Sequence, residues 1–236
     1  MNFLGQVASW FANPTHWQGD FGIPNRLYEH LLLSATSLVA AAAIALPIGI
    51  GLGHYGRFGT LAINVSNVGR AVPSFALLVI SLELFGIGFI PPFIALVALG
   101  IPPMVTNSYV GMREVDDDIR EAARGMGMRQ RIALWRVELP IALPLIMAGI
   151  RTSASNIVAT ATLAALVAWG GLGRFIIDGF SQRDTVQIFS GAVLVALLAI
   201  FVEVGLSAVQ RLTVPEGLRL TQSAGEVATV PQPAVL

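Results

Sequence analysis

Long apolar stretches alternate with short polar or charged ones along most of the chain. A helix needs about 20 consecutive apolar residues to cross a bilayer. Stretches of this length lie at roughly 29–52, 60–85, 92–112, 141–168 and 186–210. The pattern therefore predicts an all-α membrane protein with about five transmembrane helices.

The second to fourth predicted spans carry polar side chains that a simple membrane anchor does not need. An unpaired Arg in hydrocarbon costs about 2.5–3.5 kcal/mol on insertion scales, so these faces should meet water or other protein. We predict a translocation pathway lined by Arg70, Pro73, Ser74, Asn107, Ser155 and Asn156. Hydrogen bonds between helices are the alternative role of each Ser and Asn. For Arg70 the alternative is an ion pair with Glu83 or Glu203.

The most charged stretch of the chain, residues 113–140, lies between two apolar spans. Its first part predicts a short amphipathic helix over 113–124. Acidic residues 116–118 would occupy the first turn, where they suit the helix dipole. Asp116 would also pair with Arg120, four residues further on.

Two glycines, Gly125 and Gly127, then predict a turn before a second short helix. That helix would stop where Pro140 opens the next span, because proline suits the start of a helix. Two explanations fit a helix–turn–helix lying at the membrane surface. It is either an interfacial loop held by lipid phosphates or a docking element for a cytosolic partner.

Composition supports a membrane protein and excludes several other classes. The 236 residues are 55% hydrophobic and 12% charged, with mean hydropathy +0.73, whereas an ordinary soluble domain has about 25% charged residues. A net charge of zero argues against a nucleic-acid surface. The chain has no Cys, and its three His are scattered, so we expect no disulfide and no metal site.

The distribution of Arg predicts how the chain crosses the membrane. If the charged stretch is cytoplasmic, five spans place nine Arg inside and three outside. The expected organisation is an extracytoplasmic N-terminal segment at 1–28, a membrane domain at 29–212 with its charged loop at 113–140, and a flexible cytoplasmic tail at 213–236. The N-terminal segment lacks the basic start of a signal peptide, and it forms either a short interfacial helix or a frayed end.

One motif inside the charged stretch carries a family resemblance. Glu121-Ala122-Ala123 is followed by three residues, Gly127, nine residues, and Val137-Glu138-Leu139-Pro140. This spacing resembles the EAA signature of bacterial ABC importer permeases, and it departs from that signature at Val137, where the family has Ile. The resemblance implies a type I importer permease bundle, of the MetI-like kind, in a bacterial inner membrane.

Other phrases narrow the resemblance further. GRAVPSFALLVI, TNSYVGMREVDDDIREAARGMGM, LWRVELPIALPLIMAGIRT and GGLGRFIIDG look like permeases for osmoprotectants such as glycine betaine, proline betaine, choline and carnitine. Permeases for methionine or another amino acid are the alternative. A stand-alone secondary transporter is more remote, because such proteins usually show internal repeats and more spans.

The resemblance also implies a division of labour between subunits. The charged loop would contain a coupling helix seated on a cytosolic ATPase, with contacts or turns from Glu121, Ala122, Ala123, Gly127, Val137, Leu139 and Pro140. Without Lys the chain has no phosphate loop of the G-x-x-x-x-G-K-[ST] type, so ATP and Mg belong to the partner. The expected partners are a second permease subunit, two ATPase subunits, a separate solute-binding protein and the lipid bilayer. We expect a transport subunit that is not an enzyme and binds no cofactor.

A last glycine-rich segment, residues 170–180, precedes the fifth span. It is expected on the extracytoplasmic side, where a gate or a docking rim for the binding protein would involve Gly170, Gly171, Gly173 and Asp178. A plain loop is the alternative.

Overall fold

A computed structural model describes residues 2–56, 59, 64, 69 and 72–213. Over this part of the chain the structure is built from helices, without a strand. The α-helices are α1 (Phe3–Ala12), α2 (Ile23–Tyr55), α4 (Ser74–Phe85), α5 (Ile90–Arg113), α6 (Asp117–Gly125), α7 (Gln130–Ala133), α8 (Leu139–Thr160), α9 (Gly173–Gln182) and α10 (Thr185–Thr213). Shorter turns of 3₁₀ or π geometry are η1 (Pro14–Trp17), η2 (Leu134–Glu138) and η3 (Ala161–Val167).

In the described residues, four helices are long and apolar enough to cross a membrane. They are α2, α5, the continuous helix Gln130–Val167, and α10, and they confirm the first, third, fourth and fifth predicted spans. The second predicted span, 60–85, lies partly outside the described residues. Its described part contains α4, an apolar helix of 12 residues.

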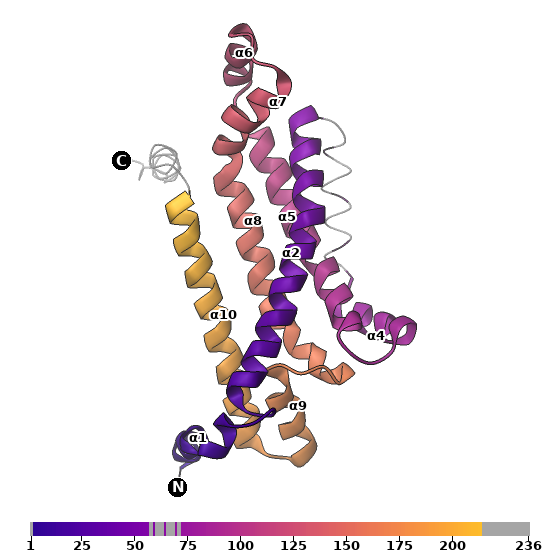
Figure 1. Cartoon of the computed structure of the whole chain (residues 1–236), viewed down its shortest axis with the longest axis vertical. Helices are drawn as coiled ribbons and strands as arrows, with labels where there is room; N and C mark the ends of the chain where they lie inside the picture. The colour runs from indigo at the N-terminus through magenta and orange to yellow at the C-terminus, as the bar shows by residue number, and fades with distance from the viewer. Residues whose placement is uncertain (1, 57–58, 60–63, 65–68, 70–71, 214–236) are drawn as a thin grey trace, which may run out of the picture.

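The core of the bundle is formed by α2, α5 and α8, which lie side by side (Figure 1). Small residues recur every four positions along the face of α2 that meets α5: Ala41, Ala45, Gly49 and Gly53. A Cβ at Gly49 would lie 2.8 Å from the Ser108 Cβ atom. Small side chains therefore let the helix backbones approach closely, which is how membrane helices gain packing energy without a hydrophobic driving force.

The second helix of the charged stretch does not stop at Pro140, in contrast to the prediction. The structure runs α7, η2, α8 and η3 together as one helix from Gln130 to Val167. The backbone widens into a π turn over Leu134–Glu138, where the Leu139 N–H donates to the Leu134 carbonyl. Proline lacks an N–H and its ring crowds the preceding turn, and a local π turn accommodates both effects without breaking the helix.

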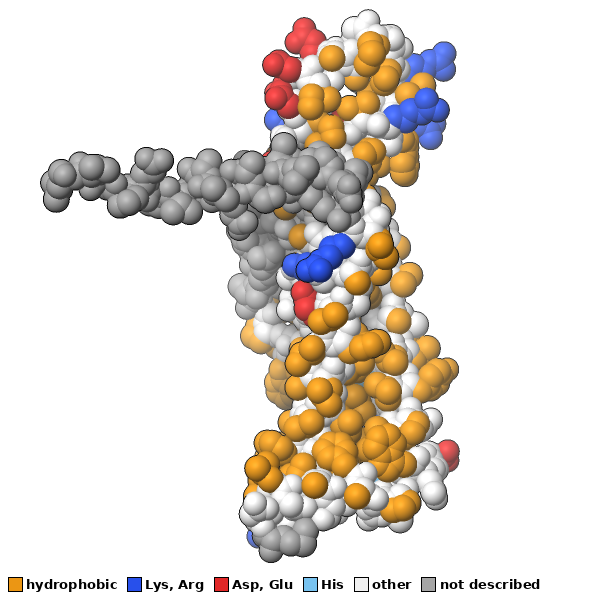
Figure 2. Space-filling model, turned by 90° about the vertical axis from the view of Figure 1, so that its left-hand side faces the viewer, with side chains coloured by type: hydrophobic (Ala, Val, Ile, Leu, Met, Phe, Trp, Pro, Cys, Tyr) orange, Lys and Arg blue, Asp and Glu red, His pale blue; other side chains and the backbone are white. Residues whose placement is uncertain are grey.

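The two ends of the elongated molecule differ in composition (Figures 1 and 2). At one end α6 and α7 extend past the bundle, and acidic and basic side chains gather around them. The other end is closed by α1 and α9. There α1 forms an ordered helix, and its buried Trp10 packs edge-on against Phe175 of α9, with ring centroids 5.5 Å apart.

Candidate coupling site at the charged end

Helix α6 begins later than the sequence predicts. Helix α5 continues through Arg113, and α6 starts at Asp117. Asp116 is its N-cap, and the Asp116 Oδ1 atom accepts a hydrogen bond of 2.9 Å from the Asp118 backbone N–H. Two acidic residues in the first turn and Arg124 in the last complement the helix dipole, as expected for a stable short helix.

Gly127 makes the turn that ends α6. Its φ is +76°, in the left-handed region that favours glycine. The Met128 N–H donates to the Ala123 carbonyl over 3.1 Å, and the Gly127 N–H donates to the Arg124 carbonyl over 2.9 Å. These two bonds form a Schellman cap. The turn predicted at this glycine is therefore present.

The predicted coupling residues of α6 divide between an inner and an outer face. Ala123 is buried against its own chain, with 1% of its surface exposed. Glu121 and Ala122 are exposed. Of the predicted coupling residues on α6, Glu121 and Ala122 are therefore the two at its surface, beside the exposed apolar side chain of Ile119.

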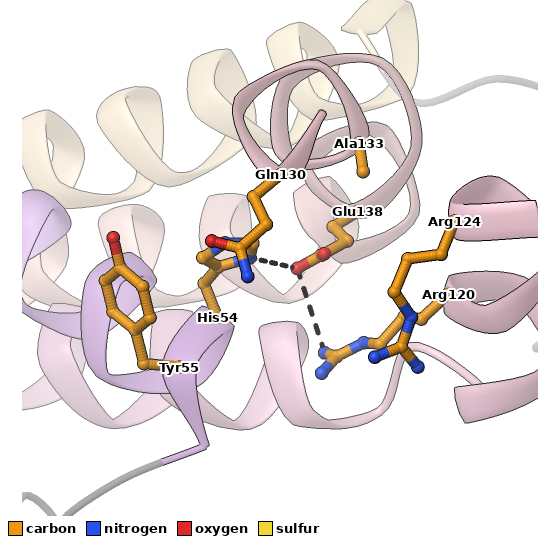
Figure 3. A pocket seen from close by; sticks show the side chains of 7 residues that line it. All are labelled: His54, Tyr55, Arg120, Arg124, Gln130, Ala133 and Glu138. Atoms are coloured by element: carbon orange, nitrogen blue, oxygen red, sulfur yellow. Dashed lines mark hydrogen bonds and ion pairs between the residues drawn. The ribbon is translucent and has the colours of Figure 1, made fainter. Parts of the chain in front are cut away.

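The inner face of the charged end contains a buried carboxylate, that of Glu138. Its Oε2 atom lies 2.8 Å from the His54 Nδ1 atom and 3.9 Å from a guanidinium nitrogen of Arg120. Figure 3 shows these side chains converging from three elements: His54 from the end of α2, Arg120 from α6 and Glu138 from η2. Arg120 also donates to the Met112 carbonyl at the end of α5. One acidic side chain thus joins the coupling element to the bundle helices.

A cavity of about 440 Å³ opens beside this cluster. It is lined by His54, Tyr55, Arg120, Arg124, Gln130, Ala133 and Glu138 (Figure 3). Most of these side chains are polar, so the cavity suits water or a polar group of a partner.

Sequence reasoning missed the pair of Glu138 and His54 and assigned Arg120 a different partner. The Asp116 carboxylate caps the backbone of α6, and Arg120 turns inward to Met112 and Glu138 instead of pairing with Asp116. A local i,i+4 rule favoured the pair with Asp116. The one available signal was that Glu138 is the only acidic residue of the sequence between Glu121 and Asp178.

The remaining motif residues lie where the coupling element joins the span. Val137, Leu139 and Pro140 are half-buried. Leu139 packs against the cluster of Met112, Val115, Ala142 and Ile146. Beyond them Met126, Ile132 and Trp135 expose 70%, 42% and 67% of their surfaces. A charged end that also exposes large apolar side chains has the character of a protein-binding surface.

The predicted pathway residues lie in different surroundings. Pro73 caps α4 and is exposed, and Ser74 lines a small cleft between α4, α5 and η3. Asn107 donates to the Pro103 carbonyl of its own helix over 2.8 Å. Arg70 lies outside the described residues.

Ser155 and Asn156 both lie on α8. The Ser155 hydroxyl donates to the Glu203 Oε2 atom of α10 over 2.6 Å, and Asn156 is exposed. Glu203 also pairs with Arg151, whose Nε atom is 2.9 Å from the Glu203 Oε1 atom. Arg151 is not among the predicted pathway residues, although it stands one turn before Ser155 and shares Glu203 with it.

The glycine-rich segment predicted as a gate or docking rim is packed tightly at the opposite end. The Gly171 N–H donates to the Glu29 Oε2 atom over 2.8 Å. A Cβ at Gly173 would fall on the Thr162 carbonyl. Asp178 pairs with Arg174 within α9, at 2.8 Å. Close packing by itself accounts for these glycines, and the gate remains a prediction.

The described residues include no cluster of three or more His, Asp or Glu that would hold a metal ion. Their charged chemistry is instead that of ion pairs and helix caps. The fold and this site together define a multi-span membrane protein with a charged helical element between its third and fourth predicted spans.

Comparison with known proteins identifies the family. Residues 43–216 match the family described as "Binding-protein-dependent transport system inner membrane component". The carnitine transport permease protein OpuCB of Listeria monocytogenes is 36% identical over 84% of this chain and 91% of its own length. The choline transport system permease protein OpuBB of Bacillus subtilis is 34% identical over 82% of this chain and 89% of its own. This chain belongs to the family of inner membrane components of binding-protein-dependent transport systems.

A solved structure supports the fold. A chain of the MetNI methionine ABC transporter, in an inward-facing conformation, superimposes with a TM-score of 0.70 over 80% of this chain and 94% of that one. Their sequence identity is 21%. The predicted MetI-like permease bundle is therefore confirmed.

Proposed function

We propose that this chain is the permease subunit of an ATP-driven importer for osmoprotectants, delivered by a separate binding protein. The observation that carries the proposal is the EAA-type element itself. Its α6 surface is exposed at Glu121 and Ala122, while its inner face is tied to the bundle through Glu138. Relatives named as carnitine and choline permeases supply the class of solute: small quaternary ammonium compounds.

The geometry supports a mechanical role for the charged end. A force applied to α6 by a partner would reach α2 through His54 and α5 through the Met112 carbonyl, because Arg120 and Glu138 contact both. The Arg120 and Glu138 side chains are largely buried, so water competes less for their charges and their attraction is stronger than that of an exposed pair. ATP hydrolysis and Mg binding would then belong to two ATPase subunits, and this chain would be no enzyme.

The proposal also specifies how the chain is oriented in the membrane and with what it assembles. The charged end would face the cytoplasm, as the excess of Arg there favours, with the N-terminus outside and the C-terminus inside. A second permease subunit, identical or different, would complete the pathway. Methionine or another amino acid is a weaker candidate, because the methionine transporter resembles this chain in fold at low identity.

Reconstitution in proteoliposomes with the cognate ATPase and binding protein tests the proposal. Uptake of labelled glycine betaine, choline and methionine is measured with and without internal ATP. ATP-dependent uptake of glycine betaine or choline is expected. Methionine uptake in their place would overturn the solute class, and uptake without ATP or the ATPase would overturn the importer.

A further inference from the structure

A second polar cluster lies away from the charged end, between α8 and α10. Arg151 and Glu203 form an ion pair of 2.9 Å. The Ser155 hydroxyl donates to the other Glu203 oxygen over 2.6 Å, and Arg151 donates to the Gln210 Oε1 atom over 3.0 Å. Gln210 in turn donates to the Pro144 carbonyl over 3.3 Å. Both charges are therefore held in fixed positions by neutral neighbours.

The cluster lies deep within its helices. Glu203 is ten residues before the end of α10, which is about 15 Å at 1.5 Å per residue. Arg151 lies within the long helix Gln130–Val167, away from both of its ends. Figure 2 likewise shows acidic and basic side chains within the mostly apolar middle of the molecule. Charges at this depth are found facing a bundle interior or a water-filled cavity.

The pair is nevertheless open to one side. The Arg151 and Glu203 side chains are 34% and 44% exposed. On α8 the neighbouring exposed residues are polar or small: Thr152, Asn156 and Ala159. On α10 the exposed face is apolar, with Leu197, Ile200, Phe201 and Val204 at 58% to 75% exposure. The apolar face of α10 suits contact with lipid, whereas the polar face of α8 that includes Arg151 suits contact with water.

We propose that Arg151 and Glu203 form a solute site within the pathway, at which a zwitterionic quaternary ammonium compound replaces the ion pair. The inference rests on the proposed function. A betaine carries a carboxylate and an ammonium group, so its carboxylate takes the place of Glu203 beside Arg151. Its ammonium takes the place of Arg151 beside Glu203. The empty site is neutral because its two charges satisfy each other.

This arrangement distinguishes two kinds of solute. A zwitterion makes one ionic contact with each partner, whereas choline, a cation without a carboxylate, makes one contact and leaves Arg151 unpaired. Removing either protein charge should therefore change the uptake of the two solutes by different factors. A pair that merely holds α8 to α10 would affect both solutes equally.

The test measures the ratio of choline to glycine betaine uptake, each as kcat/KM, in the reconstituted complex with ATPase and binding protein. Glu203→Gln leaves a lone cation that repels choline, so the ratio should fall. Arg151→Gln leaves a lone anion that favours choline, so the ratio should rise. We expect the uptake ratios of the two variants to differ by about tenfold, because each variant changes one modest ionic contact and the two changes act in opposite directions on the ratio. Arg174→Gln, which removes an Arg from a similarly exposed pair on α9, should leave the ratio unchanged.

A variant with an unpaired charge can fail to assemble, and the double variant Arg151→Gln with Glu203→Gln provides for that case. It leaves no unpaired charge, and it should lose more betaine uptake than choline uptake, because the zwitterion loses two contacts. Equal loss of choline and betaine uptake, with recovery in the charge-swapped Arg151→Glu, Glu203→Arg variant, would overturn the inference. It would show that the pair only holds α8 to α10. Wild-type complex that takes up neither solute with ATP would overturn the proposed function as well.

Discussion

The two ends of the molecule each contain a carboxylate that joins separate segments, and they use it differently. At the charged end Glu138 joins side chains: His54 of α2 and Arg120 of α6. At the opposite end Glu29 accepts from Arg26 within its own helix and from the Gly171 backbone N–H, over 2.8 Å in both cases. At the charged end the separate segments are joined by contacts between side chains. At the opposite end they are joined by a side chain that accepts from the backbone of a glycine.

The two ends also differ in what they leave exposed. At the charged end the anchoring groups are buried while the outer face of α6 keeps Glu121, Ala122 and Ile119 exposed. At the opposite end Trp10, Leu172 and Phe175 are buried in one apolar cluster. A firmly rooted element with a free outer face suits docking, whereas a closed apolar cluster suits a fixed cap.

Replacing Glu138 should have the largest effect on stability. Glu138→Ala removes the carboxylate and leaves the Arg120 charge nearly buried, and breaking such a pair costs roughly 3–5 kcal/mol. We expect a clearly lower thermal midpoint in detergent, together with loss of ATP-coupled uptake. Glu114→Ala is the matched control, because Glu114 is exposed at the end of α5. Equal midpoints for the two variants would show that the cluster does not anchor α6.

The second-largest effect on stability is expected from Gly173→Ala, at the opposite end of the molecule. The new methyl group would meet the Thr162 carbonyl, which is backbone and has little freedom to shift. Overpacking of this kind costs about 1–3 kcal/mol, so recovery of monodisperse protein should fall. Gly125→Ala is the control, since nothing lies within 4 Å of its added Cβ. A stable Gly173→Ala protein would contradict the packing account of this segment.

A smaller effect is expected at the turn after α6. Gly127→Ala forces a side chain into a φ of +76°, at about 1–2 kcal/mol. The strain should fray the end of α6, so ATP-coupled uptake should fall more than the thermal midpoint does. Gly127→Asn should be milder, because Asn tolerates this conformation better. Equal uptake by the Ala and Asn variants would argue against a need for this turn geometry.

The smallest change in stability is expected at Glu121. Its side chain is exposed, and substitutions at such positions usually stay within about 0.5 kcal/mol. Glu121→Gln should therefore melt like the wild type while losing ATP-coupled uptake and affinity for the ATPase. The comparison is sharpest against Glu138→Ala, which should lose both stability and uptake. Normal uptake by Glu121→Gln would remove this side chain from the docking surface.

Much of the fold was predictable because it depends on local pattern. Apolar runs longer than a bilayer is thick identify α2, α5, α8 and α10 with little ambiguity. The turn at Gly127 was also predictable, since glycine there follows a short helix with a charged end. Helix ends were less accurate: the break expected at Pro140 is absent, because a π turn absorbs the proline.

The sequence by itself determined the class of protein, most of its helical spans, and the place of the charged helical element, because hydropathy, turn chemistry and motif spacing are properties of neighbouring residues. Tertiary structure alone decided which charges meet. Glu138 lies 84 positions from His54, and Glu203 lies 48 positions from Ser155. Their partners depend on which helix faces the bundle packs together, and no local rule contains that information.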